Sequence, residues 1–260
     1  DDIVTDATLE AFRCGYRHVD TAAVYQNERG VGEAIARTDL DRSDLFITTK
    51  VWNTDHGYDN TLKAMDKSLG LLGLDYVDLY LIHWPSPATG DFLATWDAVL
   101  ALRDRGLTRS VGVSNFHVSH LESIIERFGV VPAVDQIELH PWSQKRELVD
   151  YLRATGIAPI AYSSLVPLST WRAAEGHDSA KTGEMQAASE AADSPFAAMA
   201  RKYGVTEAQV LLRWGVQQGY AVLPKSTNPE RIRQNIDVFD FELSDEQMDL
   251  IDSLDESVPS

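Results

Sequence analysis

Short β-rich runs alternate with helical patterns along nearly the whole chain, and few folds are built in this way. Runs such as "LFITTKVW" and "VDLYLIHW" stay apolar on both faces until their last residues, which is typical of parallel strands that are covered by helices. The pattern predicts strands at residues 16–21, 45–52, 77–83, 110–116, 133–140, 157–163 and 220–224. Helical patterns lie between them, at residues 28–37, 60–72, 92–105, 118–128, 145–154 and 207–218.

This repeated order of strand and helix predicts a parallel α/β fold, and a length of 260 residues suits a (β/α)8 TIM barrel. A doubly wound open sheet is the alternative. We expect one domain over residues 1–260, because 44% of the residues are hydrophobic and no stretch is typical of an interdomain linker. A closed barrel needs an eighth strand, whereas the chain opens on a helical pattern, "DDIVTDATLEAFRCG". We therefore expect that the first strand is missing and that the chain begins inside its domain.

Composition argues against several classes of function. The single cysteine, Cys14, excludes an internal disulfide and a CxxC motif, which fits a cytoplasmic protein. No apolar run reaches the ~20 residues that span a bilayer, and a net charge of −17 argues against nucleic acid or an anionic membrane as partner. His117 and His120 lack a third ligand, so we expect no metal site. We also expect a monomer.

Polar residues stand at the ends of the predicted strands, where a barrel of this kind places its chemistry. Asp20, Lys50 and His83 each close an apolar run, and a buried Lys or His is costly unless it has a partner. If the strands share one barrel, these three side chains converge on one rim, with Tyr25 just above them. The later strand ends carry further polar residues, namely Ser114, Asn115, Gln136, Tyr162, Ser163 and Lys225.

A Tyr hydroxyl beside an ammonium and a carboxylate can serve as a proton donor. A free phenol has a pKa near 10, and we expect Lys50 to lower the pKa of Tyr25 by stabilising the phenolate while Asp20 holds Lys50 in place. His83 would orient a carbonyl group by a hydrogen bond. Proton donation to a carbonyl oxygen is half of a reduction, and a hydride source must supply the other half.

Six blocks of the sequence resemble the aldo-keto reductase family, in its order and at its spacing: "GYRHVDTAAVYQNERGVGEAI", "TTKVWN", "VDLYLIHWP", "SVGVSNF", "VDQIELHP" and "LPKSTNPERIRQN". The resemblance covers the chain except for the missing first strand and residues 166–194. It implies a (β/α)8 barrel that reduces aldehydes and ketones with NADPH. It also implies a catalytic tetrad of Asp20, Tyr25, Lys50 and His83. The short loops look closest to the bacterial diketogluconate-reductase-like branch.

The resemblance further implies where NADPH binds. Ser114, Asn115 and Gln136 would hydrogen-bond the nicotinamide carboxamide, and Tyr162 would stack on the nicotinamide ring. At the adenosine end, the cations of "KSTNPERIRQN" would face the 2′-phosphate. The other implied cofactor residues are Ser163 and Leu165 after Tyr162, and Lys225, Ser226, Thr227, Arg231, Gln234 and Asn235 in the adenosine block.

Aromatic residues near His83 suggest the kind of substrate. Trp52, Trp84 and Phe116 are expected to wall the substrate mouth, which suits apolar or mixed carbonyl compounds. Residues 166–194 are polar and are expected to form a long loop, and the resemblance implies that this loop folds over the pyrophosphate. After Tyr162 the chain reads Ser-Ser-Leu-Val-Pro, where the family usually has Ser-x-Leu-Gly-Ser.

Two other classes of function fit parts of the sequence. A non-catalytic NADP-binding regulatory subunit would need the cofactor residues but not the complete tetrad. A barrel enzyme that acts on phosphorylated substrates would use "PKST" to hold the phosphate, and would leave Tyr25 and the "VSN" block without a role. Because all four tetrad residues are present, the sequence favours the carbonyl reductase.

Overall fold

The computed structural model describes residues 2–86, 91–168 and 195–256. The chain divides into two units by its internal contacts, and each unit is described by itself. The first unit comprises Asp1–Ile137, Asp150–Pro159 and Ser226–Ile232. The second comprises Glu138–Val149, Ile160–Lys225 and Arg233–Ser260. The expectation of one domain over the whole chain stays a prediction.

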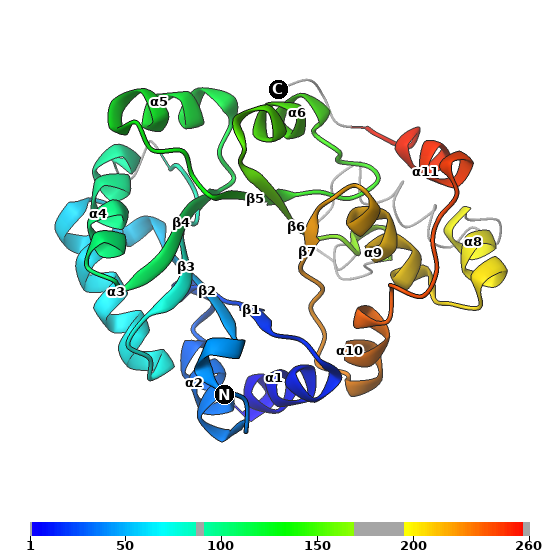
Figure 1. Ribbon diagram of the computed structural model, residues 1–260, viewed down its shortest axis with the longest axis horizontal. Helices are drawn as coiled ribbons and strands as arrows, with labels where there is room; N and C mark the ends of the chain where they lie inside the picture. The colour runs from blue at the N-terminus through cyan, green and yellow to red at the C-terminus, as the bar shows by residue number, and fades with distance from the viewer. Residues whose placement is uncertain (1, 87–90, 169–194, 257–260) are drawn as a thin grey trace, which may run out of the picture. The chain divides into compact units, whose positions relative to one another are not determined.

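Parallel strands of the first unit pair in chain order (Figure 1). Asp20 lies opposite Thr48, Lys50 opposite Leu81, and Ser114 opposite Gln136. A doubly wound sheet would reverse its strand order at one point, and these strands show no such reversal. They are β1 (His18–Asp20), β2 (Phe46–Val51), β3 (Val77–Ile82), β4 (Thr108–Ser114) and β5 (Val134–Glu138).

The helices between these strands pack against their neighbours in sequence (Figure 1). Asp91 caps the N-terminus of α4 by accepting hydrogen bonds from two backbone amides. Gly32 of α2 lies so close to α3 that a Cβ atom there would clash with the backbone oxygen of Leu72. Such contacts cover the outer side of the strands with α1 (Asp2–Cys14), α2 (Glu28–Arg37), α3 (Tyr58–Leu72), α4 (Phe92–Asp104) and α5 (Val118–Phe128).

Short 3-10 helices in the first unit shape the connections between strands and helices. One of them carries Tyr25 between β1 and α2, and another follows Trp52 after β2. These helices are η1 (Ala23–Tyr25), η2 (Arg42–Asp44) and η3 (Asn53–Asp55). Consequently, residues at the carboxyl ends of β1 and β2 are followed at once by tight turns.

The second unit contains a short parallel pair of strands and several helices. Ile160 of β6 (Ala158–Tyr162) lies opposite Ala221 of β7 (Ala221–Val222). The helix expected after Ser244 is present and begins with a capping box between Ser244 and Gln247. Of the helices that the structure describes, those entirely in this unit are η4 (Val166–Leu168), α8 (Pro195–Tyr203), α9 (Glu207–Gln217) and α11 (Asp245–Asp252). Two more, α6 (Arg146–Thr155) and α10 (Pro229–Ile236), have residues in both units.

The core of the first unit is built from the strands and the helix faces turned toward them. Ile47, Leu79, Leu81 and Trp96 are fully or almost fully buried there. Within the part of the chain that the structure describes, no helix is long and apolar enough to cross a membrane.

Candidate active site

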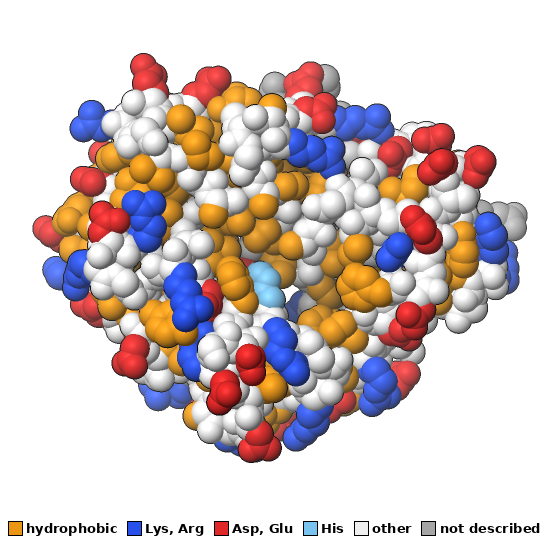
Figure 2. All heavy atoms as spheres, in the orientation of Figure 1, with side chains coloured by type: hydrophobic (Ala, Val, Ile, Leu, Met, Phe, Trp, Pro, Cys, Tyr) orange, Lys and Arg blue, Asp and Glu red, His pale blue; other side chains and the backbone are white. Residues whose placement is uncertain are grey.

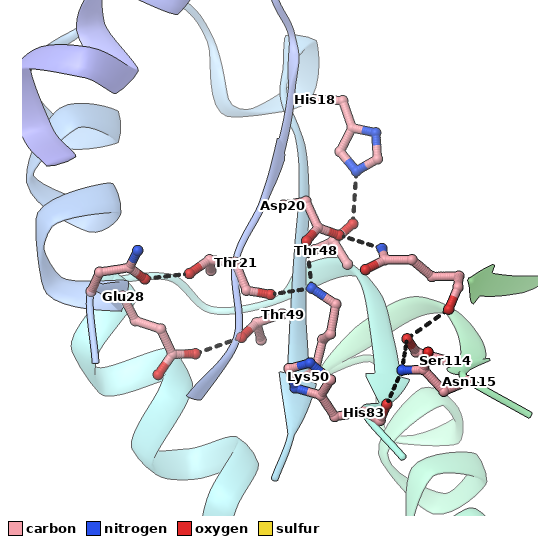
Figure 3. Close-up of polar contacts among 12 residues, drawn as sticks. His18, Asp20, Thr21, Glu28, Thr48, Thr49, Lys50, His83, Ser114 and Asn115 are labelled. Atoms are coloured by element: carbon pink, nitrogen blue, oxygen red, sulfur yellow. Dashed lines mark hydrogen bonds and ion pairs between the residues drawn. The ribbon is translucent and has the colours of Figure 1, made fainter. Parts of the chain in front are cut away.

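Asp20, Lys50 and His83 lie together at the carboxyl ends of β1, β2 and β3 in the first unit (Figure 3). The Lys50 side chain is fully buried, and its Nζ forms an ion pair with Asp20 Oδ1. Lys50 Nζ also donates a hydrogen bond to the backbone oxygen of Thr21, at 2.9 Å. A buried ammonium is costly unless it is paired, so these two contacts explain how an apolar strand tolerates Lys50.

Tyr25 approaches this group from the turn η1. Its ring centroid lies 5.2 Å from Lys50 Nζ and 5.6 Å from the centroid of the His83 ring. The side chain is 48% exposed, so one side of it is open to an incoming molecule. The four residues expected to form a catalytic tetrad are therefore neighbours in the structure.

The pKa of Tyr25 differs from the sequence-based expectation. Burial, and next to it the negative charge of Asp20, raise the pKa of Tyr25 to about 12. We expected Lys50 to lower this pKa, but its charge is balanced by the ion pair with Asp20, whose carboxylate itself opposes a second negative charge. Tyr25 accordingly keeps its proton throughout the physiological pH range.

His83 is held as a neutral imidazole. Burial, and next to it the positive charge of Lys50, lower the pKa of His83 to about 3. Its Nδ1 is buried and has no hydrogen-bond partner among the described residues. The ring packs edge-to-face on Trp52, with the centroids 5.1 Å apart. His83 can thus offer a hydrogen bond at this site, but it does not carry a positive charge there.

We expect the lowered pKa of His83 to make the protein less stable in mild acid. Between the folded pKa of about 3 and the unfolded value of 6.5, the unfolded state binds a proton that the folded state does not. The free energy of unfolding should therefore fall as the pH drops below about 6.5. Burial also lowers the pKa of His18 and of His56, which adds to the same trend.

Chemical denaturation at a series of pH values would measure this trend. The His83→Gln variant, which cannot take up the proton, should lose stability less steeply than the wild type as the pH falls. Equal slopes for the two proteins would contradict the assignment of a neutral, acid-sensitive His83.

The polar residues at the ends of β4 and β5 form a hydrogen-bonded network beside the tetrad. Gln136 Nε2 donates to Asp20 Oδ2 at 2.8 Å, and Ser114 Oγ donates to the backbone oxygen of Gln136 at 2.7 Å. Asn115 Nδ2 donates to the backbone oxygen of His83 at 3.0 Å, while its backbone has a φ of +62°. In this structure the Gln136 amide group therefore helps to fix Asp20, a contact that the sequence did not predict.

The residues expected to contact the nicotinamide ring and the pyrophosphate lie in the second unit. Tyr162 is half-buried at the end of β6, and the following Ser163 has a left-handed backbone with a φ of 59°. Leu165 is half-buried, and the turn η4 begins at Val166. The predicted loop over residues 166–194 falls mostly outside the described residues, because residues 169–194 are not described.

The residues expected at the adenosine end lie just before α10 in the sequence or within it. Asn228 is placed as a helix cap, since its Oδ1 accepts a hydrogen bond from Arg231 N at 3.1 Å. Ser226 Oγ accepts one from Asn228 N at 3.1 Å. Ser226, Thr227 and Arg231 belong to the first unit, whereas Lys225, Gln234 and Asn235 belong to the second.

The cations of this block are available to an anion. Lys225 and Arg231 are exposed, and neither forms an ion pair with any other described residue. Acidic and basic side chains are interspersed on the face drawn in Figure 2, although the net charge of the chain is −17. Thr227 is exposed, Gln234 is half-buried, and Asn235 is 8% exposed.

The three residues expected to form the aromatic wall differ in their exposure. Trp84 is 41% exposed and Trp52 is half-buried beside His83. Phe116, in contrast, is 1% exposed, and its ring packs against Phe92 and His120. The side chain of Phe116 is thus enclosed by residues at the start of α4 and on α5, and its place in the wall of the substrate mouth stays a prediction.

His117 and His120 take part in the start of α5. The backbone N–H of His117 donates to His120 Nδ1 at 3.2 Å, which helps to cap the helix. Among the described residues, no group of three or more His, Cys, Asp or Glu side chains is arranged to hold a metal ion.

Sequence reasoning missed the contacts that hold the loop between β1 and α2. Thr49 Oγ1 donates to Glu28 Oε1 at 2.6 Å, and Thr21 Oγ1 donates to Asn27 Oδ1 at 2.6 Å (Figure 3). All of these residues belong to the blocks "GYRHVDTAAVYQNERGVGEAI" and "TTKVWN". Helix α2 also carries Arg29, Glu33 and Arg37, so nothing in the sequence distinguished Glu28 as a buried carboxylate.

Comparisons of the sequence with a family model and with known proteins point to one family. The model of the Aldo/keto reductase family matches residues 2–256. An aldo-keto reductase of Mycolicibacterium smegmatis is 48% identical over 249 residues, which are 96% of this chain and 83% of the relative. A glyoxal reductase of Bacillus subtilis is 42% identical over 250 residues, again 96% of this chain and 83% of the relative.

A solved structure supports the same likeness. The aldo-keto reductase of Bombyx mori in complex with NADP has a TM-score of 0.88 and 38% sequence identity, and the match covers 98% of this chain and 83% of that one. The fold class expected from the sequence, a (β/α)8 barrel, is confirmed by these matches.

Proposed function

The chain belongs to the aldo/keto reductase family, and we propose that it is an NADPH-dependent reductase of aldehydes and ketones in which Tyr25 is the proton donor. The family makes it an oxidoreductase. One observation carries the finer proposal: a protonated Tyr25, a neutral His83 and the Lys50–Asp20 ion pair lie side by side at one end of parallel strands. A protein that only sensed the cofactor would not need this arrangement.

Tyr25 donates its proton to the carbonyl oxygen of the substrate. Its pKa of about 12 means that the proton is present at any physiological pH. An alkoxide is a stronger base than such a phenolate, so transfer of the proton to the oxygen is favourable once negative charge develops there. The product is then a neutral alcohol and a phenolate at Tyr25.

Lys50 stabilises the negative charge that Tyr25 acquires. Its ammonium group lies 5.2 Å from the centre of the Tyr25 ring and cannot move away, because Asp20 and the Thr21 carbonyl hold it. Asp20 is in turn fixed by Gln136. A charge that is placed before the reaction stabilises the transition state without reorganisation.

His83 orients the carbonyl group. As a neutral imidazole in a buried site it can donate one hydrogen bond to the carbonyl oxygen without competing with Tyr25 for the role of acid. Trp52 packs on its ring and restricts the ring's rotation.

The residues present suit NADPH as the cofactor. When bound, NADPH supplies the hydride that adds to the carbonyl carbon. Exposed, unpaired cations at Lys225 and Arg231 suit the 2′-phosphate, and they lie in a chain that is otherwise strongly acidic. Ser114, Asn115, Gln136 and Tyr162 would hold the nicotinamide, with Ser163 and Leu165 near the pyrophosphate and Ser226, Thr227, Gln234 and Asn235 near the adenosine. Related structures of 38% and 40% sequence identity were solved in complex with NADP and NADPH, which supports this choice.

The substrates we propose are small or partly apolar carbonyl compounds that fit beside Trp52 and Trp84. Purified protein should oxidise NADPH when it is given a panel of aldehydes, ketones and α-dicarbonyls, with glyoxal and methylglyoxal included. A protein that binds NADPH tightly but turns over none of the panel would favour the alternative, a non-catalytic NADP-binding regulatory subunit.

The role of His83 gives a separate prediction. His83→Ala should lower kcat/KM for carbonyl substrates by roughly 10²-fold, a usual range for a hydrogen-bonding catalytic group. The Kd of NADPH should stay within a few-fold of the wild-type value. The exposed His117→Ala variant is the control and should behave like the wild type. A large loss of NADPH affinity in His83→Ala would instead place His83 against the nicotinamide.

A further inference from the structure

The loop that carries Tyr25 has few internal restraints. Tyr25 makes no side-chain hydrogen bond with any described residue, so its position depends on the backbone that bears it. Within the loop, Tyr25 N donates to Ala22 O at 3.0 Å and Gln26 N donates to Ala23 O at 3.2 Å. Gln26 also has a left-handed φ of 54°, which is unfavourable for a residue with a side chain. Such a turn needs anchors elsewhere.

Two short hydrogen bonds anchor the loop at its ends (Figure 3). Thr21 Oγ1 donates to Asn27 Oδ1 at 2.6 Å and so joins the first residue of the loop to the last. Glu28 is the first residue of α2, and its Oε1 accepts a hydrogen bond from Thr49 Oγ1 of β2, also at 2.6 Å. This second bond ties the end of the loop to a central strand.

Thr49 is adjacent to Lys50 in β2. Successive side chains of a strand point to opposite faces, so Thr49 contacts α2 on the helix side while Lys50 meets Asp20 and Thr21 on the other. Strand β2 therefore carries Lys50 itself and, through the bond from Thr49 to Glu28, also fixes the end of the loop that bears Tyr25. A shift of this bond would change the distance between Tyr25 and Lys50.

Glu28 is an unusual choice for a structural contact alone. The residue is 2% exposed, and a buried carboxylate is costly. Its place in the first turn of α2 offsets part of this cost, because the helix N-terminus carries partial positive charge. The causes of the raised pKa of Tyr25 are burial and Asp20. Glu28 consequently acts through position and not through its field on the phenol.

We propose that Glu28 and Thr49 are positioning residues for the proton donor: their hydrogen bond holds the β1–α2 loop so that Tyr25 stands at the right distance from Lys50 and His83. This inference rests on the proposed function, because it presumes that Tyr25 donates the proton. Neither residue touches the substrate in this scheme.

Matched substitutions test whether the hydrogen bond matters. Thr49→Val keeps the shape of the side chain and removes the hydroxyl, and it should lower kcat about tenfold, since small displacements of reacting groups are costly. Thr49→Ser and Glu28→Gln retain a donor and an acceptor and should stay within about twofold of the wild type. The Kd of NADPH should change little in all three. A wild-type kcat for Thr49→Val, or a loss in Glu28→Gln as large as that in Thr49→Val, would overturn the proposal.

A double-mutant cycle with Tyr25→Phe separates positioning from general damage. If Thr49 acts through Tyr25, Thr49→Val should have almost no further effect on kcat once the phenol is gone. A merely structural role would lower kcat by the same factor in both backgrounds, and that result would contradict the proposal. Thr108→Val is the control, because it removes another buried hydroxyl of the same unit, which donates to Ser110 O. It should leave kcat unchanged.

Thr49→Val leaves the buried Glu28 without its hydroxyl partner and could therefore fold poorly. A second variant keeps the proposal testable in that case. The double variant Glu28→Leu/Thr49→Val replaces both partners by apolar groups, which leaves no buried acceptor unpaired. It should fold and still show the loss of kcat; a folded double variant with wild-type kcat would refute the inference. Failure of the proposed function would look different, since Tyr25→Phe alone would then keep its activity.

Discussion

Tyr25→Phe should lower kcat for carbonyl reduction by roughly 10²-fold or more, the range in which general acid catalysis contributes. Phe retains the ring that packs on His83 at 5.6 Å but has no proton to give. The loss should appear in kcat, while the Kd of NADPH stays within a few-fold, because the hydroxyl acts on the substrate oxygen. Steady-state kinetics and a cofactor titration measure the two quantities.

Tyr58→Phe provides the matched control for this variant. Tyr58 is also a partly exposed tyrosine, 40% exposed, at the start of α3, and its substitution should leave kcat unchanged. Near-normal turnover in Tyr25→Phe would remove Tyr25 from the mechanism, whatever the role of its neighbours.

The second large effect concerns the choice between NADPH and NADH. Only NADPH carries a 2′-phosphate, and the net charge of −17 repels both cofactors, so a preference must come from local cations. Charge-assisted hydrogen bonds contribute about 1.5–3 kcal/mol each. Two of them, from Lys225 and Arg231, would make the Kd of NADPH lower than that of NADH by about two to four factors of ten. Both side chains are exposed, so salt should narrow this preference.

Substitution of each cation tests this assignment. Lys225→Ala and Arg231→Ala should weaken NADPH binding more than NADH binding. The effect of Lys225→Ala should be more specific to NADPH, because Arg231 can also stack on the adenine, which both cofactors contain. Lys63→Ala, which removes an exposed cation of α3, should leave the preference unchanged. If the wild type binds NADH as tightly as NADPH at low salt, the adenosine phosphate does not bind at this block.

Much of the fold could be predicted from periodicity. The helices at Glu28–Arg37 and Val118–Phe128 have the bounds that the sequence predicted, because each has a strong amphipathic pattern and a clear end, such as Gly129 after α5. Strands were predicted in the right places but one or two residues too long at most ends. Hydrophobicity continues into the flanking turns, whereas a strand ends where its hydrogen bonds end.

Other parts of the fold could not be predicted in this way. The helix α8 follows a polar, Ala-rich stretch whose composition suits helix and loop alike, and it was not predicted. Phe196 and Met199 are both buried in α8, but the sequence does not show that they form the buried face of a helix until the bounds of that helix are known. The start of α10 is marked by Asn228 and Pro229, a capping signal in a block that we interpreted mainly as ligand-binding.

The proximity of the residues expected to form the tetrad was predictable, but their electrostatics were not. Residues at the carboxyl ends of parallel strands meet by topology, so the proximity of Asp20, Lys50 and His83 follows from the pattern. The direction of the pKa shift of Tyr25 does not, because it depends on how burial and the Asp20 charge compare with the Lys50 charge. The burial of Phe116 likewise depends on Phe92, which lies 24 residues earlier in the sequence, and on how the start of α5 folds His120 back onto its ring.

The most direct measurement follows the hydrogen atoms themselves. NADPH that carries deuterium at the transferable position of the nicotinamide is incubated with the protein and glyoxal or methylglyoxal, and the product is analysed by mass spectrometry. A carbonyl reductase should form an alcohol with one deuterium bonded to the former carbonyl carbon. The initial rate at which this alcohol forms should be roughly 10²-fold lower in Tyr25→Phe than in the wild type. An alcohol without deuterium, or no alcohol from any carbonyl compound while NADPH is bound, would contradict the proposed reduction.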